Sequence, residues 1–165
     1  MTRLRRLLLV PALLLLAGFT QTAPQAVPSP DQPPGERSAQ DKLPQSHDPL
    51  WARLARCASH FDTKAALYGI TLTPEVKAMD GKTATVSGFV LPLDGADQTR
   101  HFLLTKRTPV CLYCPPGEPN EVIEVTTRHP VAWSDDMVTV TGRFTLVADV
   151  EKAIFFALRD AEKVK

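Results

Sequence analysis

The order of apolar and polar residues predicts a leading helix in the folded part of the chain. Residues 50–61 place apolar side chains at the spacing of one helical face. Asp48 and Pro49 come directly before them, and an acceptor side chain followed by proline is typical of a helix start. A single-turn helix is expected further on, over 73–80. The expected inward face of the leading helix comprises Leu50, Leu54, Cys57 and Phe61.

From Lys82 onward the period becomes two, which is typical of β-strands. Within 82–91 the alternation holds as far as Gly88, where the apolar positions change parity. A glycine at such a point predicts a bulge or sharp coil that lets one strand belong to two sheets. The turn at 94–97 would pair this strand with the next. The four further strands are expected at 99–105, 121–126, 137–146 and 153–158.

Five short strands after a leading helix predict a mainly β protein with a small OB-like, partly open Greek-key barrel. A small β-sandwich is the alternative fold. We expect one such domain, with its N-terminal helix, over 48–165. The preceding segment, 23–47, is rich in proline, glutamine and serine, and is expected to be a disordered linker because it cannot bury enough apolar surface to fold.

Residues 1–22 have the pattern of a secretory signal peptide. Arg3, Arg5 and Arg6 precede an apolar run of 13 residues over 7–19. A membrane-spanning helix needs about 20 such residues, so the run is too short to cross a bilayer. The pattern predicts a bacterial protein that is periplasmic or secreted. If the leader were not cleaved, it would act as a weak membrane tether.

The charge of the chain argues against a nucleic-acid partner. The formal net charge is +1, and the only charged residues of 1–22 are three arginines. Without them, 16 of the 19 basic residues remain against 18 acidic ones. A slightly acidic domain lacks the basic surface that binds a phosphate backbone. No nucleic-acid binding is therefore expected.

The candidate chemistry lies between the second and third predicted strands, where Cys111 and Cys114 precede a pair of prolines. Two thiols three positions apart can bind one ion, and thiolates favour zinc or copper ions. Prolines after the pair would stiffen the loop and lower the entropy lost on binding. His101 is the first candidate for a third ligand, because its strand leads into the loop. The other candidate donors are His129, Glu118 and Cys57.

Two alternatives to metal binding stay open for these thiols. In an oxidising compartment, any two of Cys57, Cys111 and Cys114 could form a structural disulfide in a protein-interaction module. The chain could also be a thiol-disulfide exchange protein, with Cys111 attacking and Cys114 resolving. Against exchange, Pro115, Pro116 and Gly117 do not continue a helix, whose N-terminus would lower the thiol pKa. Cys57 also fits a small, buried apolar residue.

No other arrangement typical of catalysis is found in the sequence. Phosphate-binding glycine loops, His-Glu-x-x-His and Gly-x-Ser-x-Gly are all missing from it. The acids Asp135 and Asp136 are expected at a solvated strand entry, and Trp133 in the core. We therefore expect an exported, non-enzymatic accessory protein whose Cys111 and Cys114 loop is the functional surface.

Three stretches resemble a bacterial exported family known as domain of unknown function 3299, over about 72–158. They are Gly88-Phe89-Val90-Leu91-Pro92-Leu93, His101-Phe102-Leu103-Leu104, and Cys111-x-x-Cys114-Pro115-Pro116 with Pro119-Asn120. The resemblance implies a secreted protein or lipoprotein encoded near transporters and zinc-responsive components. It therefore favours metal handling, with a periplasmic or membrane transport component as partner. In another branch the loop reads Cys-x-His-x-Pro-Pro, so that Tyr113 stands where the His would be.

Overall fold

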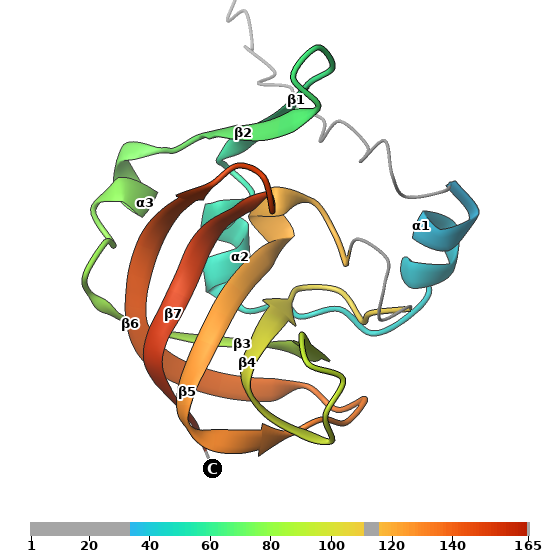
Figure 1. Cartoon of the computed structure of the whole chain (residues 1–165), viewed down its shortest axis with the longest axis vertical. Helices are drawn as coiled ribbons and strands as arrows, with labels where there is room; N and C mark the ends of the chain where they lie inside the picture. Colours follow the sequence, from blue (N-terminus) through green and yellow to red (C-terminus); the bar gives the residue numbers. More distant parts are fainter. Residues whose placement is uncertain (1–33, 111–115, 165) are drawn as a thin grey trace, which may run out of the picture.

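The computed structural model describes residues 34–110 and 116–164 (Figure 1). The helices within these residues are Pro34–Gln40 (α1), Pro49–Leu54 (α2), Pro74–Lys77 (α3) and the 3₁₀ turn Pro119–Glu121 (η1). The strands are Ala58–Asp62 (β1), Leu67–Thr71 (β2), Thr83–Pro92 (β3), Gln98–Thr105 (β4), Val122–Ala132 (β5), Val138–Asp149 (β6) and Ile154–Lys163 (β7). In the described ranges, every helix is too short or too polar to cross a bilayer.

Five strands close into a barrel in the order β3-β4-β5-β7-β6, with β6 pairing back onto β3. All neighbouring pairs are antiparallel except β5 and β7, which are parallel. Consecutive strands pair first, and the last strand then inserts between the third and the fourth. This is a Greek-key barrel of the OB type. It confirms the mainly β, OB-like fold predicted from the strand pattern.

Gly88 is the residue at which β3 changes its partner. The strand pairs with β6 over 83–88 and with β4 over 89–92. A Cβ atom built on Gly88 would lie 2.7 Å from the carbonyl oxygen of Thr105. The absence of a side chain therefore allows two backbones to approach closely. The predicted change of pairing at this glycine is confirmed, but both partners belong to one barrel and the β3 pairings contain no register shift.

Helix α2 packs against the barrel core, and its start is fixed as the sequence predicts. Asp48 is the N-cap, and its carboxylate accepts hydrogen bonds from the backbone N–H of Leu50 (2.9 Å) and of Ser87 in β3 (3.0 Å). Trp51 donates its indole N–H to the Ser87 carbonyl at 2.8 Å. The buried apolar face of α2 is Leu50, Trp51 and Leu54.

The expected helix over 50–61 is too long. Helix α2 ends at Leu54, and Phe61 lies in β1, which forms a hairpin with β2. The helical spacing of apolar residues thus continued across a turn and into a strand. Cys57 is buried at the end of that turn, whereas the residues of β1 alternate between exposed and half-buried and those of β2 are half-buried as far as Ile70.

Residues 34–47 differ from the disordered linker expected over 23–47, and we call them the N-terminal strap. They form α1 and then an extended stretch, in which Gln45 makes a β-bridge to Arg107. Gln40 and Ser46 are buried. This segment buries few apolar side chains, and hydrogen bonds from Gln40 and Ser46 to distant parts of the chain hold it in place. The predicted leader and the rest of the linker lie outside the described residues.

Candidate functional site

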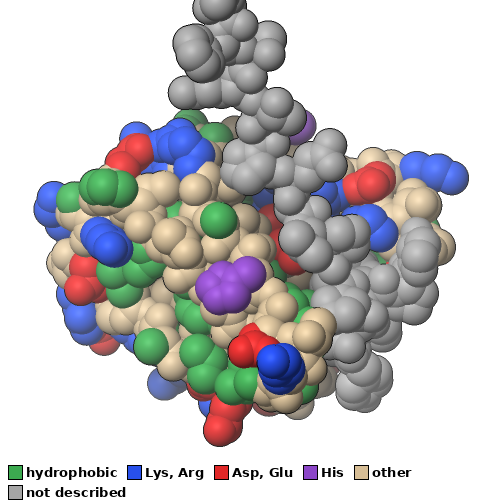
Figure 2. All heavy atoms as spheres, turned by 90° about the horizontal axis from the view of Figure 1, so that it is seen from above, with side chains coloured by type: hydrophobic (Ala, Val, Ile, Leu, Met, Phe, Trp, Pro, Cys, Tyr) green, Lys and Arg blue, Asp and Glu red, His purple; other side chains and the backbone are tan. Residues whose placement is uncertain are grey.

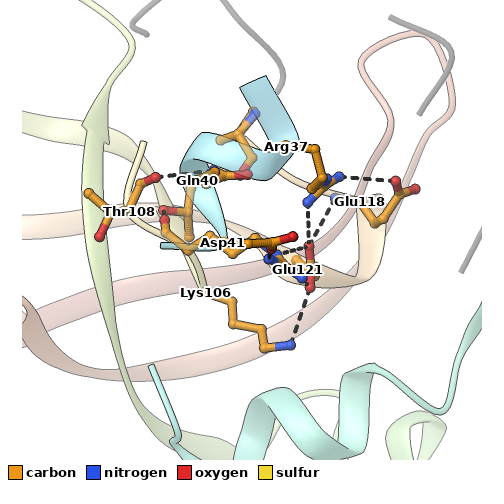
Figure 3. A network of polar contacts seen from close by, with 10 residues as sticks. Arg37, Gln40, Asp41, Lys106, Thr108, Glu118 and Glu121 are labelled. Atoms are coloured by element: carbon orange, nitrogen blue, oxygen red, sulfur yellow. Dashed lines mark hydrogen bonds and ion pairs between the residues drawn. The ribbon is translucent and has the colours of Figure 1, made fainter. Parts of the chain in front are cut away.

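The two ends of the Cys111 and Cys114 loop meet at one side chain of the strap. The cysteines themselves lie outside the described residues, but Thr108 and Pro116 on either side are described. The amide nitrogen of Gln40 donates to the carbonyl oxygen of Thr108 (3.1 Å) and to that of Pro116 (3.0 Å) (Figure 3). We call this junction the loop neck. A single buried amide therefore holds both ends of the loop.

Two buried carboxylates, Glu118 and Glu121, lie on the C-terminal side of the neck. Arg37 from the strap reaches both, at 3.2 Å and 3.4 Å respectively. Glu121 also pairs with Lys106 at 3.2 Å and with the Nε atom of Arg107 at 3.0 Å. Figure 3 shows these side chains converging from the strap and from both sides of the loop. The network ties the three segments together.

The charge of Glu121 is stabilised by its neighbours. Burial alone would raise the pKa of this carboxyl group, but the positive charges and hydrogen bonds of Arg107 and Lys106 outweigh burial and hold the pKa below its ordinary value. Arg107 is itself paired with Asp41 of the strap. Its pKa is raised despite the opposing effect of burial. Both partners are therefore ionised at neutral pH.

Backbone contacts reinforce the neck. Thr108 donates its N–H (3.3 Å) and its hydroxyl (2.7 Å) to the carbonyl of Pro44 in the strap. Lys106 donates its N–H to the Glu121 carbonyl at 3.0 Å. Asn120 donates its side-chain amide to the Cys57 carbonyl at 3.0 Å, which connects η1 to the end of the α2 segment. Both flanks of the loop are thus fixed by hydrogen bonds, of which that of Asn120 is buried and that of the Thr108 hydroxyl is exposed.

His101 has a partner that the sequence did not indicate. Its side chain is 51% exposed on β4, and its Nε2 atom lies 2.8 Å from Oε1 of Glu124 on β5. Arg159 on β7 contacts the other oxygen of Glu124 at 2.6 Å. Burial would raise the pKa of Glu124, but hydrogen bonds from His101 and Arg159 outweigh it and lower the pKa. One ring nitrogen of His101 is therefore held by a carboxylate.

The other candidate donors are dispersed. Cys57 is fully buried and is a free cysteine in the structure, where it packs as a small core residue. Glu118 is paired with Arg37, and His129 is exposed on β5. Within 34–110 and 116–164, no three His, Cys, Asp or Glu side chains come together as metal ligands would.

A cleft of about 260 Å³ is lined by the N-terminal flank of the loop together with Trp133, which is 44% exposed and so does not lie in the core as expected. On the face shown in Figure 2, basic and acidic side chains are interspersed. That face offers no continuous basic surface for a polyanion.

Sequence reasoning missed Arg37 and Gln40, the residues that fix the neck. A partial signal was present in the charges beside the loop, because Lys106 and Arg107 precede it while Glu118 and Glu121 follow it. Such flanking charges indicate that the two ends approach one another. Nothing local in the strap identifies Gln40, since its partners lie 68 and 76 positions further along the chain.

Comparisons with known proteins agree with the resemblance seen in the sequence. A family model described as "Protein of unknown function (DUF3299)" matches residues 27–157. The chain is similar to a crystallised DUF3299 family protein from Pseudomonas aeruginosa PAO1, with 20% identity and a TM-score of 0.48, over 84% of this chain and 85% of that one. No curated protein matches it.

Proposed function

The chain belongs to the DUF3299 family of proteins of unknown function, and we propose that it is an exported, non-enzymatic accessory protein that binds a thiophilic metal ion. The ligands are the thiolates of Cys111 and Cys114, and the ion is Zn²⁺ or Cu⁺, which soft sulfur ligands select. A periplasmic or membrane transport component is the partner with which such an ion would be exchanged.

The observation that carries this proposal is the pair of hydrogen bonds that Gln40 donates to the carbonyls of the loop neck, those of Thr108 and Pro116. Holding two thiols near one ion costs conformational entropy, and a loop whose ends are already fixed loses less of it on binding. The ion pairs of Glu118 and Glu121 with Arg37 brace the same junction. A buried polar network of this kind supports a role for the loop that demands a defined geometry.

His101 is the proposed third ligand. Its Nε2 atom already contacts Glu124, so an ion would bind through Nδ1 or replace the carboxylate. A carboxylate that orients a ligating histidine is common in metal sites. We expect His101→Ala to weaken metal affinity without changing the number of reactive thiols. Unchanged affinity would remove His101 from the ligand set.

Metal content and thiol state, measured on the same preparation of the full chain, test the proposal. Elemental analysis by mass spectrometry gives the ion per chain, and intact mass after alkylation in denaturant counts the free thiols. We expect one ion per chain and three alkylated thiols in the wild type. The ion should be lost in both Cys111→Ser and Cys114→Ser. Cys57→Ala, which alters only the buried free cysteine, is the matched control and should keep the ion.

The alternative functions give different results in that experiment. A metal-free chain whose Cys111 and Cys114 are oxidised and resist mild reductant would overturn metal binding in favour of a structural disulfide. A pair that cycles readily between the oxidised and reduced states, with a depressed thiol pKa, would overturn it in favour of thiol-disulfide exchange. Export is tested separately by cell fractionation and by sequencing the N-terminus of the mature chain.

A further inference from the structure

A second cleft, of about 400 Å³, lies between the β1–β2 hairpin and the connection from β6 to β7. In Figure 1 this connection runs beneath the hairpin at the top of the barrel. The hairpin contributes Phe61 and Tyr68, and the barrel wall contributes Leu103 and Val122. This volume lies in the range of small-molecule sites, and OB barrels bind ligands on this face, beside the loop between their last two strands.

Most of the described residues that line the cleft are apolar, and two of them are aromatic. The rings of Phe61 and Tyr68 contact each other across the hairpin as a tilted pair, with centroids 4.9 Å apart and planes inclined by 57°. Val150 and Ile154 line the same cleft from the β6–β7 connection. Aromatic side chains on one element and aliphatic ones on another are suited to contact with a ring or a short apolar chain.

The charged side chains among the described lining residues, Glu151 and Lys152, are both exposed. The ammonium group of Lys152 already donates to Asp149 at 2.9 Å. A charged ligand in contact with the apolar lining residues would lose its hydration without gaining a buried partner of opposite charge among the described residues. The chemistry therefore favours an uncharged ligand.

Backbone strain is concentrated at this cleft. Three non-glycine residues in the described part of the chain have positive φ: Ala66 (55°), Ala153 (54°) and Asp160 (53°). The two alanines come from different loops, and both line the cleft. Alanine has no polar side chain to stabilise a left-handed conformation by local hydrogen bonding. Strain of this kind persists where the surroundings enforce it, and it gathers at ligand sites.

We propose that this cleft is a binding site for a small, uncharged molecule that carries a flat apolar ring. The proposal requires no thiolate and no metal ion. The cleft shares Pro116 with the loop neck, but the residues from which its ligand is argued come from the hairpin, the barrel wall and the β6–β7 connection. Binding of the small molecule should therefore persist in the Cys111→Ser variant. Loss of the metal ion and loss of small-molecule binding are thus measured separately, so each proposal can fail without the other.

N-phenyl-1-naphthylamine, an uncharged amine that carries a naphthyl and a phenyl group and whose fluorescence rises in apolar surroundings, is a suitable probe. We expect saturable binding of one probe per chain. Val150→Glu should weaken it at least tenfold by placing a carboxylate at the lip of the cleft, where Val150 is 38% exposed. The matched control is Val164→Glu at a 45% exposed valine that is not among the lining residues, and it should leave binding unchanged.

Two further measurements complete the test. Leu103→Trp should fill the floor of the cleft and also weaken binding at least tenfold, provided that the thermal unfolding midpoint shows a folded variant. The anionic analogue 8-anilinonaphthalene-1-sulfonate should bind at least tenfold more weakly than the neutral probe. Non-saturable binding, an equal loss in Val164→Glu, unchanged binding in both cleft variants, or a preference for the anionic probe would overturn the proposal.

Discussion

Gly88 shows how one missing side chain permits the barrel to close. A Cβ atom at this position would meet the Thr105 carbonyl oxygen at 2.7 Å and the Leu104 Cγ atom at 2.9 Å. Backbone atoms cannot move aside as the end of a flexible side chain can. We expect Gly88→Ala to lower the free energy of unfolding by about 2 kcal/mol, measured by urea denaturation.

Gly35 is the matched control for that substitution. No atom lies within 4 Å of a Cβ built there, and the residue belongs to α1. Alanine is the better helix former, so Gly35→Ala should leave stability unchanged or raise it by less than about 1 kcal/mol. Equal losses in the two variants would contradict the close approach assigned to Gly88.

Glu121 gives stability a dependence on pH. Its folded-state pKa lies below the ordinary value of 4.5, so the unfolded chain binds its proton more readily than the folded chain does. Its contribution is complete above that value and is lost as the pH falls through the lower, folded-state pKa. We expect the free energy of unfolding of the wild type to fall in this acidic window.

Glu121→Gln removes this titration. The substitution should lower the free energy of unfolding by roughly 3 kcal/mol at neutral pH, because Arg107 and Lys106 lose a buried partner. This loss should shrink as the pH falls below 4.5 and through the lowered folded-state pKa of Glu121. Glu75→Gln is the control, since that carboxylate is 47% exposed and pairs with Arg53 at the surface. Parallel pH profiles for wild type and Glu121→Gln would show that Glu121 is not the titrating group.

At the scale of elements, the strap depends on Gln40. Gln40→Ala removes the donor of two neck carbonyls, and an unpaired buried carbonyl costs about 1–3 kcal/mol. We expect the flank of the loop to loosen, so that trypsin cuts after Arg107 faster than in the wild type. The rate is measured by mass spectrometry of native-state digests.

The same substitution at Gln45 is the control for that experiment. Gln45 contacts Arg107 through a backbone bridge, which alanine preserves. Gln45→Ala should therefore leave the cleavage rate close to that of the wild type. If both variants were cut at the wild-type rate, the strap would not be what protects this flank.

The barrel strands could be predicted because the alternation of buried and more exposed positions is visible in each strand's own residues. In β6, Val138, Val140 and Phe144 are buried and alternate with more exposed residues, so the period of two is visible in the sequence itself. The parity change at Gly88 was visible for the same reason. The start of α2 depends on adjacent residues, Asp48 and Pro49, and was equally predictable.

The hairpin, the helix end and the strap could not be predicted in this way. Strands β1 and β2 contain no buried residue: β1 alternates only between exposed and half-buried positions, and β2 does not alternate, so neither has the apolar period of a core strand. The strap is ordered by Gln40, Arg37 and Ser46, whose partners lie in other elements. The thiols of the candidate site could be found from their spacing, whereas the partners of His101 and the neck residues are brought together only by the fold.

At the scale of the whole molecule, the strap moves the start of the folded unit from residue 48 to 34. A chain that begins at Pro34 should unfold at the same temperature as the full chain. One that begins at Asp48 lacks Gln40 and leaves Glu118 and Glu121 without Arg37. We expect it to unfold on the order of 10 °C lower by calorimetry. Equal midpoints for the two truncated chains would contradict a structural role for the strap.

The position of β7 has a consequence for how the chain is made. Of the five barrel strands it is synthesised last, yet it lies between β5 and β6 and supplies the parallel pairing. Until it has been made, the edges of β5 and β6 have no partner in the ring. All five strands must therefore have left the ribosome before the ring can form, and a translation product that stops before Ile154 should be degraded by proteases faster than one that includes β7.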